Sequence, residues 1–477
     1  MKTKCEVRER EGNAGQSAAV ALEAVAERVA AAMSEEVTGF ACRAQENLGH
    51  LEEKITALAR ELVREALREG AQRKADATAP RCPQCGQVLK RQSDGHGRTF
   101  TTRAGDITVR RKRGYCAQCR KWRVAADQVL GLADTAGYSP SVQEMGALLV
   151  SKMPVSEASL VLERLTGIKV PPATLDREAR RQGQRAQAVR TALDQRPSAP
   201  ARPRAQLALP LAPYQMSLQI DAWHIRERDA WGQSAQSRRR GEEPERWHWV
   251  YTGTCFRLDH RGQTAGGRPI ITERGFVATR GGIDALREQL HAEARRRGLG
   301  QAAGALVIAD GAVWIWRLAD DRFPAARQRR DFYHAVQHLS AVGQALYGED
   351  QAKLHAWLQP LVRQLKNESA VKVVRALEEV LAAMPAGAAQ AKVQTEVAYF
   401  HTHQQRLDYR AARRRGEPIG SGAIEATCRQ YQCRFKRTGQ FWTRNGDESL
   451  LCLDTFWRNG RWSLLFPHVL PSDPARN

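Results

Sequence analysis

The chain has 477 residues, of which 74 are lysine or arginine and 52 are aspartate or glutamate, so the formal net charge is +22 and the pI is near 10.0. Hydrophobic residues at 42% and charged residues at 26% exclude a wholly disordered or collagen-like chain. No segment reaches the roughly 18 uncharged apolar residues of a membrane span, and the N-terminus lacks the apolar core of a signal peptide. We therefore expect a cytoplasmic protein of about three domains with no membrane partner.

The positive charge is unevenly distributed along the chain. Residues 1–80 carry 12 basic and 14 acidic side chains, whereas residues 81–130 carry 12 basic and 3 acidic ones. A near-neutral head before a basic body indicates an assembly segment followed by a region that binds a polyanion, with nucleic acid as the favoured partner. The alternative is that the excess is generic solubilising charge.

Residues 1–78 are rich in alanine, glutamate and leucine and are predicted to be helical. Apolar side chains recur there at spacings of three and four residues and form one stripe, made of Leu48, Leu51, Ile55, Leu58 and Leu62. The stripe fits either a coiled-coil seam between the protomers of a homo-oligomer or a helix packed on its own domain.

Two Cys-x-x-Cys pairs mark residues 79–130. Cys82 and Cys85 form the first pair, Cys116 and Cys119 form the second, and a strand-like run lies between them. Two such pairs on β-turns present four thiolates tetrahedrally, as one structural Zn²⁺ requires, so we predict a zinc ribbon. The alternative is two unrelated buried cysteine pairs. The basic strand of the ribbon is expected to contact DNA through Arg110, Arg111, Lys112 and Arg113.

Residues 131–195 are predicted to form consecutive short helices. Ser139 precedes a proline and opens the first helix, Ser156 caps the second, and Gly167 ends it. The third helix, over residues 173–190, is basic and is expected to contact DNA through Arg177, Arg180 and Arg181. This order is typical of a helix-turn-helix DNA-binding domain, with an ordinary three-helix module as the alternative. Residues 196–213 are rich in proline and alanine and are predicted to be a linker.

From residue 214 the pattern changes to strands. Strands are expected over residues 216–220, 247–258, 269–279 and 305–309, with a helix over 283–297 before the last of them. The first strand is expected to end in Asp221 and the last, a buried parallel strand, in Asp310. Because such strands present functional groups at their carboxyl ends, we expect the two aspartates to converge. Glu425 lies in the first turn of a later helix.

Asp221, Asp310 and Glu425 are the candidate catalytic and metal-binding residues. Three such carboxylates can hold two Mg²⁺ ions, with Mn²⁺ as a substitute, which activate a water or a 3′-hydroxyl and stabilise the leaving oxygen of a phosphoryl displacement. Each acid also has an ordinary explanation. Asp310 fits an aspartate in a turn, Asp221 an incidental acid at a strand end, and Glu425 a carboxylate at a helix N-terminus.

Four motifs resemble the ISKra-type insertion-sequence transposases, which are prokaryotic DDE enzymes with an RNase H-like core. The motifs lie at residues 219–223, 309–316, 331–335 and 420–425, the last together with 434–439. The resemblance covers most of the chain. It implies Asp221, Asp310 and Glu425 as the metal-binding triad, and cleavage and strand transfer between transposon terminal repeats and target DNA as the activity. It also implies a nucleoid-associated location.

The resemblance further implies that Asp331 and His334 match a C/D-x-x-H signature beside the core. In physical terms, His334 would orient or protonate a phosphate oxygen; the alternative is an aspartate that caps a helix and a surface histidine. Trp314 and Trp316 are expected in the core rather than as base-stacking platforms.

The complete prediction is a multidomain α+β protein. The RNase H-like α/β core comprises residues 214–335 and its last helix and tail 416–477, with a helical insertion over 336–415.

Cys428 and Cys433 are about 140° apart on a helix and are not expected to share a metal. Basic runs on both sides of Glu425 are expected to contact phosphates: Arg413, Arg414, Arg415, Arg434, Lys436 and Arg437.

Three functions fit this pattern. The first is a Mg²⁺-dependent DNA transposase. The second is a non-catalytic DNA-binding regulator built from the zinc ribbon and the helix-turn-helix. The third is another RNase H-like nuclease, which would cut DNA without joining strands.

Overall fold

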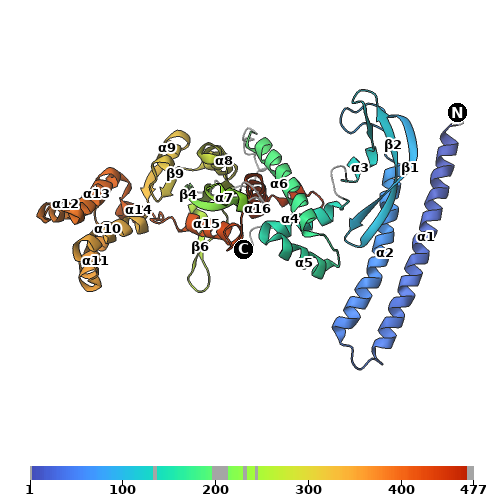
Figure 1. The fold of residues 1–477 in the computed structure, drawn as a ribbon, viewed down its shortest axis with the longest axis horizontal. Coiled ribbons are helices and arrows are strands. Elements are labelled where there is room, and N and C mark those ends of the chain that lie inside the picture. The colour runs from blue at the N-terminus through green and yellow to red at the C-terminus, as the bar shows by residue number, and fades with distance from the viewer. Residues whose placement is uncertain (1–2, 133–136, 196–212, 229–233, 242–244, 470–477) are drawn as a thin grey trace. The chain divides into compact units, whose positions relative to one another are not determined.

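The computed structural model describes residues 3–132, 137–195, 213–228, 234–241 and 245–469, so most of the predicted linker lies outside the described residues. The chain is a mixed α and β protein with several sheets (Figure 1). It divides into two compact units, Met1–Ala179 and Arg180–Asn477. None of the described helices is long and apolar enough to cross a membrane.

Two long helices, α1 (Thr3–Phe40) and α2 (Leu48–Asp76), lie side by side in the first unit (Figure 1). Asn47 caps α2 by accepting a hydrogen bond from the Gly49 N–H at 3.0 Å. The predicted apolar stripe is half-buried from Leu51 onward, because α2 contacts both α1 and a strand of the ribbon, while Leu48 is exposed. The stripe therefore packs within its own chain; a seam between protomers remains a prediction.

A three-stranded antiparallel sheet follows α2, as the ribbon prediction required. Phe100 pairs with Ile107 across a tight turn, and both pack in a small core with Val109. The sheet and the short helix after it consist of β1 (Lys90–Thr102), β2 (Gly105–Cys116), β3 (Lys121–Arg123) and α3 (Ala125–Val129).

Three consecutive helices complete the first unit and extend into the second: α4 (Pro140–Lys152), α5 (Val155–Thr166) and α6 (Pro172–Asp194). Ser139 caps α4, and Gly167 ends α5 with the positive φ of +71° that glycine tolerates. The prediction that Ser156 caps α5 is wrong. The helix begins one residue earlier, after Pro154, and has no side-chain cap.

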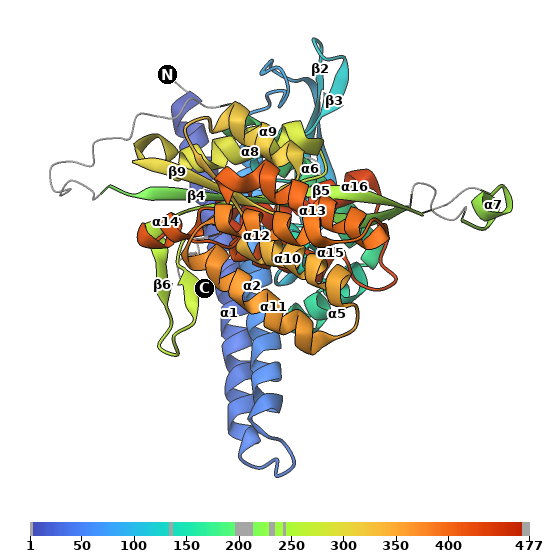
Figure 2. The ribbon, with the colours of Figure 1, turned by 90° about the vertical axis from the view of Figure 1, so that its left-hand side faces the viewer.

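The second unit is built on a five-stranded mixed sheet with the strand order β10-β9-β4-β5-β8. The strands β4, β5 and β8 run antiparallel, whereas β9 and β10 run parallel to β4. Figure 2 shows that β4 and β5 form a long hairpin with the helix α7 at its end. The bounds are β4 (Gln215–Arg228), α7 (Ser234–Arg239), β5 (Glu245–Arg257), β8 (Gly275–Thr279), β9 (Gly304–Ala309) and β10 (Arg327–Arg330).

The predicted strand over 269–279 is interrupted. Its first part, β7 (Pro269–Ile271), pairs with β6 (Arg261–Gln263) in a separate two-stranded sheet, and only β8 joins the main sheet. The break follows from Thr272, whose N–H donates to the His260 carbonyl at 2.9 Å and closes the small hairpin. A 3-10 turn, η1 (Leu258–His260), links β5 to β6.

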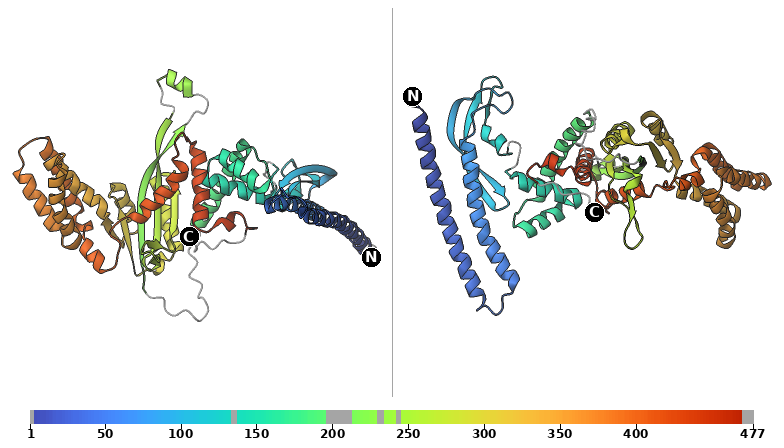
Figure 3. Two further views of the ribbon diagram at one scale, coloured as in Figure 1. Left: turned by 90° about the horizontal axis from the view of Figure 1, so that it is seen from below. Right: turned by 180° about the vertical axis from the view of Figure 1, so that it is seen from behind.

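Helices cover both faces of the main sheet (Figure 3). Met216, Leu218 and Ile220 of β4 pack in one core with α8 (Gly282–Arg296) and α9 (Val313–Arg322), and this core includes Trp316 and borders Trp314, as predicted. Side chains alternate along a strand, so Gln219 and Asp221 face the other side. There α15 (Gly422–Phe435) and α16 (Arg444–Arg458) contact the sheet. Short elements complete this part: η2 (Leu299–Gln301) and α17 (Trp462–Leu465).

The region predicted as a helical insertion is helical and has a hydrophobic core of its own. Leu339, Val373, Leu377 and Phe400 are among its buried members. Its elements are α10 (Phe332–Tyr347), α11 (Gln351–Asn367), α12 (Ala370–Ala383), α13 (Ala388–His403), η3 (Gln404–Arg406) and α14 (Tyr409–Arg414).

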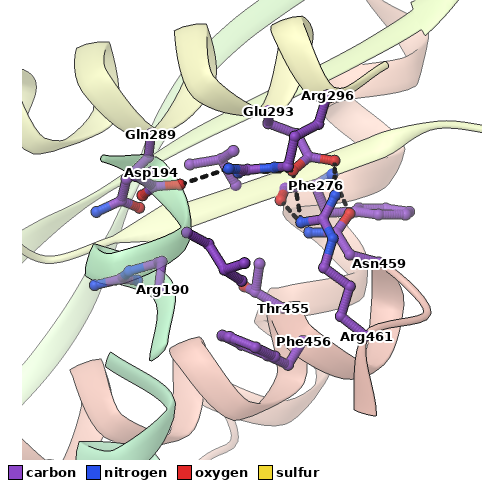
Figure 4. Close-up of a pocket in the computed structure, with 12 residues that line it drawn as sticks. Arg190, Asp194, Phe276, Gln289, Glu293, Arg296, Thr455, Phe456, Asn459 and Arg461 are labelled. Carbon is purple, nitrogen blue, oxygen red and sulfur yellow. Dashed lines mark hydrogen bonds and ion pairs between the residues drawn. The ribbon is translucent and has the colours of Figure 1, made fainter. Parts of the chain in front are cut away.

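A buried charge network joins α8 to α6 and to the segment after α16 (Figure 4). Glu293 accepts hydrogen bonds from Arg461 at 2.7 and 2.8 Å and from Arg297 at 2.9 Å, and Arg296 also donates to Asp194 at 2.8 Å. Burial alone would raise the pKa of Glu293, but the arginines outweigh it and lower the pKa to about 2. The adjoining cavity of about 30 Å³ has room for a single water, so the network is structural.

Candidate functional site

The four predicted cysteines converge at the end of the ribbon hairpin. All four sulfur atoms lie within 4.8 Å of one another, with Cys82 and Cys116 buried. The Sγ atoms of Cys82 and Cys119 are 3.9 Å apart, and those of Cys85 and Cys116 are 3.4 Å apart. Four thiolates around one Zn²⁺ at about 2.3 Å would be roughly 3.8 Å from each other. The set is therefore consistent with one structural Zn²⁺.

The backbone favours a thiolate at Cys82. A hydrogen bond from the Cys85 backbone N–H lowers the pKa of Cys82 to about 6, whereas hydrogen bonding to Cys85 and burial raise the pKa of Cys119 to about 12. The thiolate is the form that binds zinc. Gly86 adopts a φ of +75° and donates its N–H to the Cys82 carbonyl at 2.9 Å, which closes the tight turn.

Asp221 and Asp310 lie at the same edge of the main sheet. The last β4–β9 pair is Gln219 with Ile308, so continuing this register by two residues sets Asp221 opposite Asp310. The expectation that the first strand ends in Asp221 is wrong, because β4 continues to Arg228 in its pairing with β5. The shorter β9 stops at Ala309, beside the middle of β4, and Asp310 follows directly after it.

The surroundings of the two aspartates differ. Burial raises the pKa of Asp221, and the nearby charge of Asp310 raises it further. Asp221 accepts hydrogen bonds from the Ala222 N–H at 2.7 Å and from the Cys428 thiol at 3.7 Å. Asp310 accepts one from the Ala312 N–H at 3.2 Å, just before α9 begins. The charge of one aspartate therefore acts on the other, which is the electrostatic evidence that the two side chains are near each other.

Asp331 follows β10 and caps α10, which was the alternative to a phosphate-orienting role for Asp331 and His334. It is buried and accepts hydrogen bonds from the His334 N–H at 2.8 Å, from the Ser421 hydroxyl at 2.8 Å and from the Ser421 N–H. Burial alone would raise the pKa of Asp331, but the bonds from His334 and Ser421 lower it to about 2. Asp331 thus holds the loop before α15 against the start of α10.

His334 is partly exposed and lies near Asp221 and Asp310. Its Nδ1 lies 3.2 Å from Asp331 Oδ1, and this contact raises the pKa of His334 despite partial burial. The charges of Asp310 and Asp221 raise it further, so these side chains share one neighbourhood. His338, one turn later, instead stacks on Tyr399 and contacts Glu396 at 2.6 Å.

Glu425 occupies the first turn of α15, as predicted, but it is not gathered with the two aspartates. Its side chain is 59% exposed and accepts a hydrogen bond from Arg429 at 2.5 Å. Among the described residues, the cysteines form the one group of three or more candidate ligands within 4.8 Å. The predicted Mg²⁺ triad is therefore not assembled in this structure.

Cys428 is the residue of this site that the sequence argument missed. It lies three residues after Glu425, on the same side of α15, and it is buried beside Asp221. Gln219 fixes the start of this helix by accepting a hydrogen bond from the Ile424 N–H at 3.0 Å. The three-residue spacing indicates that Glu425 and Cys428 are neighbours on one helix. It does not indicate that Cys428 packs against β4.

Two of the predicted DNA-contacting arginines are corrected by the structure. Arg111 is buried because it shares the inward face of β2 with Ile107 and Val109, and it donates to both carboxylate oxygens of Asp127 at 2.5 and 2.6 Å. Arg434 is buried against aromatic rings. The other predicted contacts are exposed or half-buried: Arg110, Lys112, Arg113, Arg177, Arg180, Arg181, Arg413, Arg414, Arg415, Lys436 and Arg437.

Comparisons of the chain with models of protein families and with curated proteins find no match.

Proposed function

We propose that this protein is a DDE-type DNA transposase of the ISKra kind, which binds its element's terminal repeats and catalyses strand cleavage and strand transfer. The observation that carries the proposal is the position of Asp221 and Asp310 near the carboxyl end of β9, where the charges of both raise the pKa of His334, in a chain of net charge +22. The mixed sheet covered by helices on both faces supports an RNase H-like core.

In this proposal Asp221 and Asp310 would hold two divalent cations, Mg²⁺ or Mn²⁺, and Glu425 would join them after its ion pair with Arg429 opens. The ions would activate the attacking oxygen and stabilise the leaving oxygen of a phosphoryl displacement. Asp331 orients His334 through Nδ1 and leaves Nε2 available to a phosphate oxygen. Glu425 lies three residues before Cys428 on α15, and the Cys428 thiol donates to Asp221.

DNA binding is assigned to the zinc ribbon and to α4, α5 and α6 as a helix-turn-helix. Exposed basic side chains on both, including Arg110, Lys112 and Arg177, suit phosphate contacts. We further propose that the protein acts as a homo-oligomer in the prokaryotic cytoplasm, on its terminal repeats and on target DNA.

The test compares Asp310→Asn with Asp284→Asn, an exposed aspartate on α8. Both variants are expected to bind terminal-repeat DNA like the wild type, while only Asp310→Asn loses Mg²⁺- or Mn²⁺-dependent cleavage and joining. Strand transfer retained by Asp310→Asn would refute the assignment. Products that are cut but never joined would instead indicate a nuclease.

One observation favours a second function. The exposure of Glu425 and its pairing with Arg429 fit a non-catalytic DNA-binding regulator with a degenerate core. A regulator would bind terminal repeats but yield no cleavage with either metal. Wild-type protein that cleaves a terminal-repeat substrate excludes this alternative.

A further inference from the structure

The outer half of the β4–β5 hairpin carries two exposed tryptophans. Trp247 and Trp249 of β5 are 54% and 47% exposed. They are two residues apart on one strand and therefore lie on the same face. Their partners on β4 are Arg226, opposite Trp247, and His224, opposite Trp249. Figure 2 shows the hairpin that carries them.

Basic side chains lie on these rings. The ring of His224 lies tilted by 35° against that of Trp249 with centroids 3.6 Å apart, and the Arg226 guanidinium lies 5.2 Å from the centroid of Trp247. The Lys436 ammonium lies 5.6 Å from the same Trp247 ring. Arg226 also lies 5.2 Å from the centroid of Phe441, so one guanidinium joins two aromatic rings.

A third segment completes this surface. The Trp442 N–H donates to the Arg226 carbonyl at 3.1 Å, and the Arg228 N–H donates to the Trp442 carbonyl at 2.8 Å. These bonds hold Phe441 beside β4, where the Arg228 guanidinium lies 3.9 Å from its ring. We call the following side chains the hairpin patch: His224, Arg226, Trp247, Trp249, Lys436 and Phe441.

One acidic residue of β4, Glu227, is turned away from the patch. Glu227 is buried on the opposite face and forms an ion pair with Arg280. The patch therefore offers aromatic faces and positive charge together. An aromatic cluster that served only the core would be buried, whereas Trp247 and Trp249 are about half exposed.

We propose that the hairpin patch binds single-stranded DNA, with unpaired bases stacked on Trp247 and Trp249 and phosphates near Arg226 and Lys436. Stacking on rings and pairing of phosphates with cations are the two components of single-strand recognition, whereas a duplex hides its base faces. The inference rests on the proposed function for its choice of DNA.

The experiment measures binding of a fluorescein-labelled oligothymidylate and of a duplex of equal length by fluorescence anisotropy, using the full chain. Trp247→Ala and Trp249→Ala are each expected to weaken oligothymidylate binding about tenfold. Trp247→Phe and Trp249→Phe keep a ring and should lose less. Duplex binding, assigned to the first unit and the helix-turn-helix, should change less than about twofold in all four variants.

Charge is tested separately through the salt dependence. Lys436→Ala should reduce the slope of log affinity against log salt by about 0.7 for the oligothymidylate, as expected when one phosphate contact is lost from a single strand. Lys372→Ala, an exposed lysine of α12 paired with Glu368, serves as the matched control and should leave the slope unchanged. Circular dichroism and thermal unfolding identify any variant that fails to fold.

Equal losses for oligothymidylate and duplex, or no loss from either tryptophan change, would overturn the proposal. Its failure is distinguishable from failure of the proposed function. Asp310→Asn should bind oligothymidylate like the wild type, so single-strand binding is measurable even if no cleavage is found. Conversely, terminal-repeat cleavage by the wild type is measurable even if the hairpin patch binds no single strand.

Discussion

Replacing Asp331 with asparagine tests whether one buried carboxylate holds the candidate site together. The substitution keeps the shape of the side chain but removes its charge and turns one oxygen into an NH₂ group. That group cannot accept a hydrogen bond from Ser421. Asparagine still caps a helix well, so the bond to the His334 N–H can persist. We therefore expect Asp331→Asn to break the hydrogen bonds that join the start of α10 to the loop before α15.

The magnitude follows from the pKa of Asp331, which is lowered from its ordinary 3.8 to about 2. A shift of nearly two units at 1.36 kcal/mol per unit corresponds to about 2 kcal/mol at neutral pH. Since the side chain is only 4% exposed, solvent screening does not reduce this figure much. A change of about 2 kcal/mol makes local opening roughly 30 times more frequent.

The assay is hydrogen exchange of the backbone amides over residues 419–425, compared between wild type and Asp331→Asn at pH 7. Asp350→Asn is the matched control. Asp350 caps α11 by accepting a bond from the Lys353 N–H at 3.1 Å, but it is exposed and makes no second link of this kind. We expect roughly 30-fold faster exchange for Asp331→Asn and less than about threefold for the control.

The pH dependence has a definite sign. A depressed pKa contributes stability above pH 3.8 and loses it as the pH falls toward 2, so the gap in melting temperature between wild type and Asp331→Asn should close over that window. If Asp331→Asn behaves like Asp350→Asn at pH 7, or if the gap stays constant from pH 4 to 2, the charge of Asp331 does not hold the loop.

Two further predictions concern the framework. Cys116→Ser should lower the zinc content from about one ion per chain to nearly none, measured by metal analysis, whereas the exposed Cys42→Ser should retain it; zinc retained by the first variant would contradict the four-thiolate site. Glu293→Gln should destabilise the second unit by about 3 kcal/mol, because it removes a buried carboxylate that three partly exposed arginines share, and the effect should fade as the pH falls from 4.5 to 2. Thermal unfolding checks this against Glu288→Gln, which is exposed and should shift the transition little.

Local signals in the sequence were sufficient for much of the fold. The cap at Ser139, the stop at Gly167 and the buried strand before Asp310 are all decided within a few residues, and the structure confirms them. The paired cysteines are equally local, because each Cys-x-x-Cys turn presents two sulfurs by its own geometry. The spacing of the cysteines does not by itself show that the two pairs lie close together. The antiparallel pairing of β1 with β2 brings the second pair next to the first, as the predicted hairpin implied.

Only the tertiary structure decided how the candidate site is arranged. Periodicity marks Asp221 as a strand residue, but the point at which β9 stops beside β4 is a long-range pairing, and it sets Asp221 opposite Asp310 in mid-strand. Likewise, helical spacing placed Glu425 on α15, while the packing of α15 on β4 buries Cys428 beside Asp221 and leaves Glu425 to Arg429.

The same distinction applies to the positive charge. Composition determined by itself that the chain carries +22 and that most of it follows the head. It could not separate the buried Arg111 and Arg434 from exposed arginines, nor bring Lys436 to Trp247 across almost two hundred residues. Sequence spacing encodes neighbours along the chain, whereas burial and charge placement depend on which distant elements exclude water from one another.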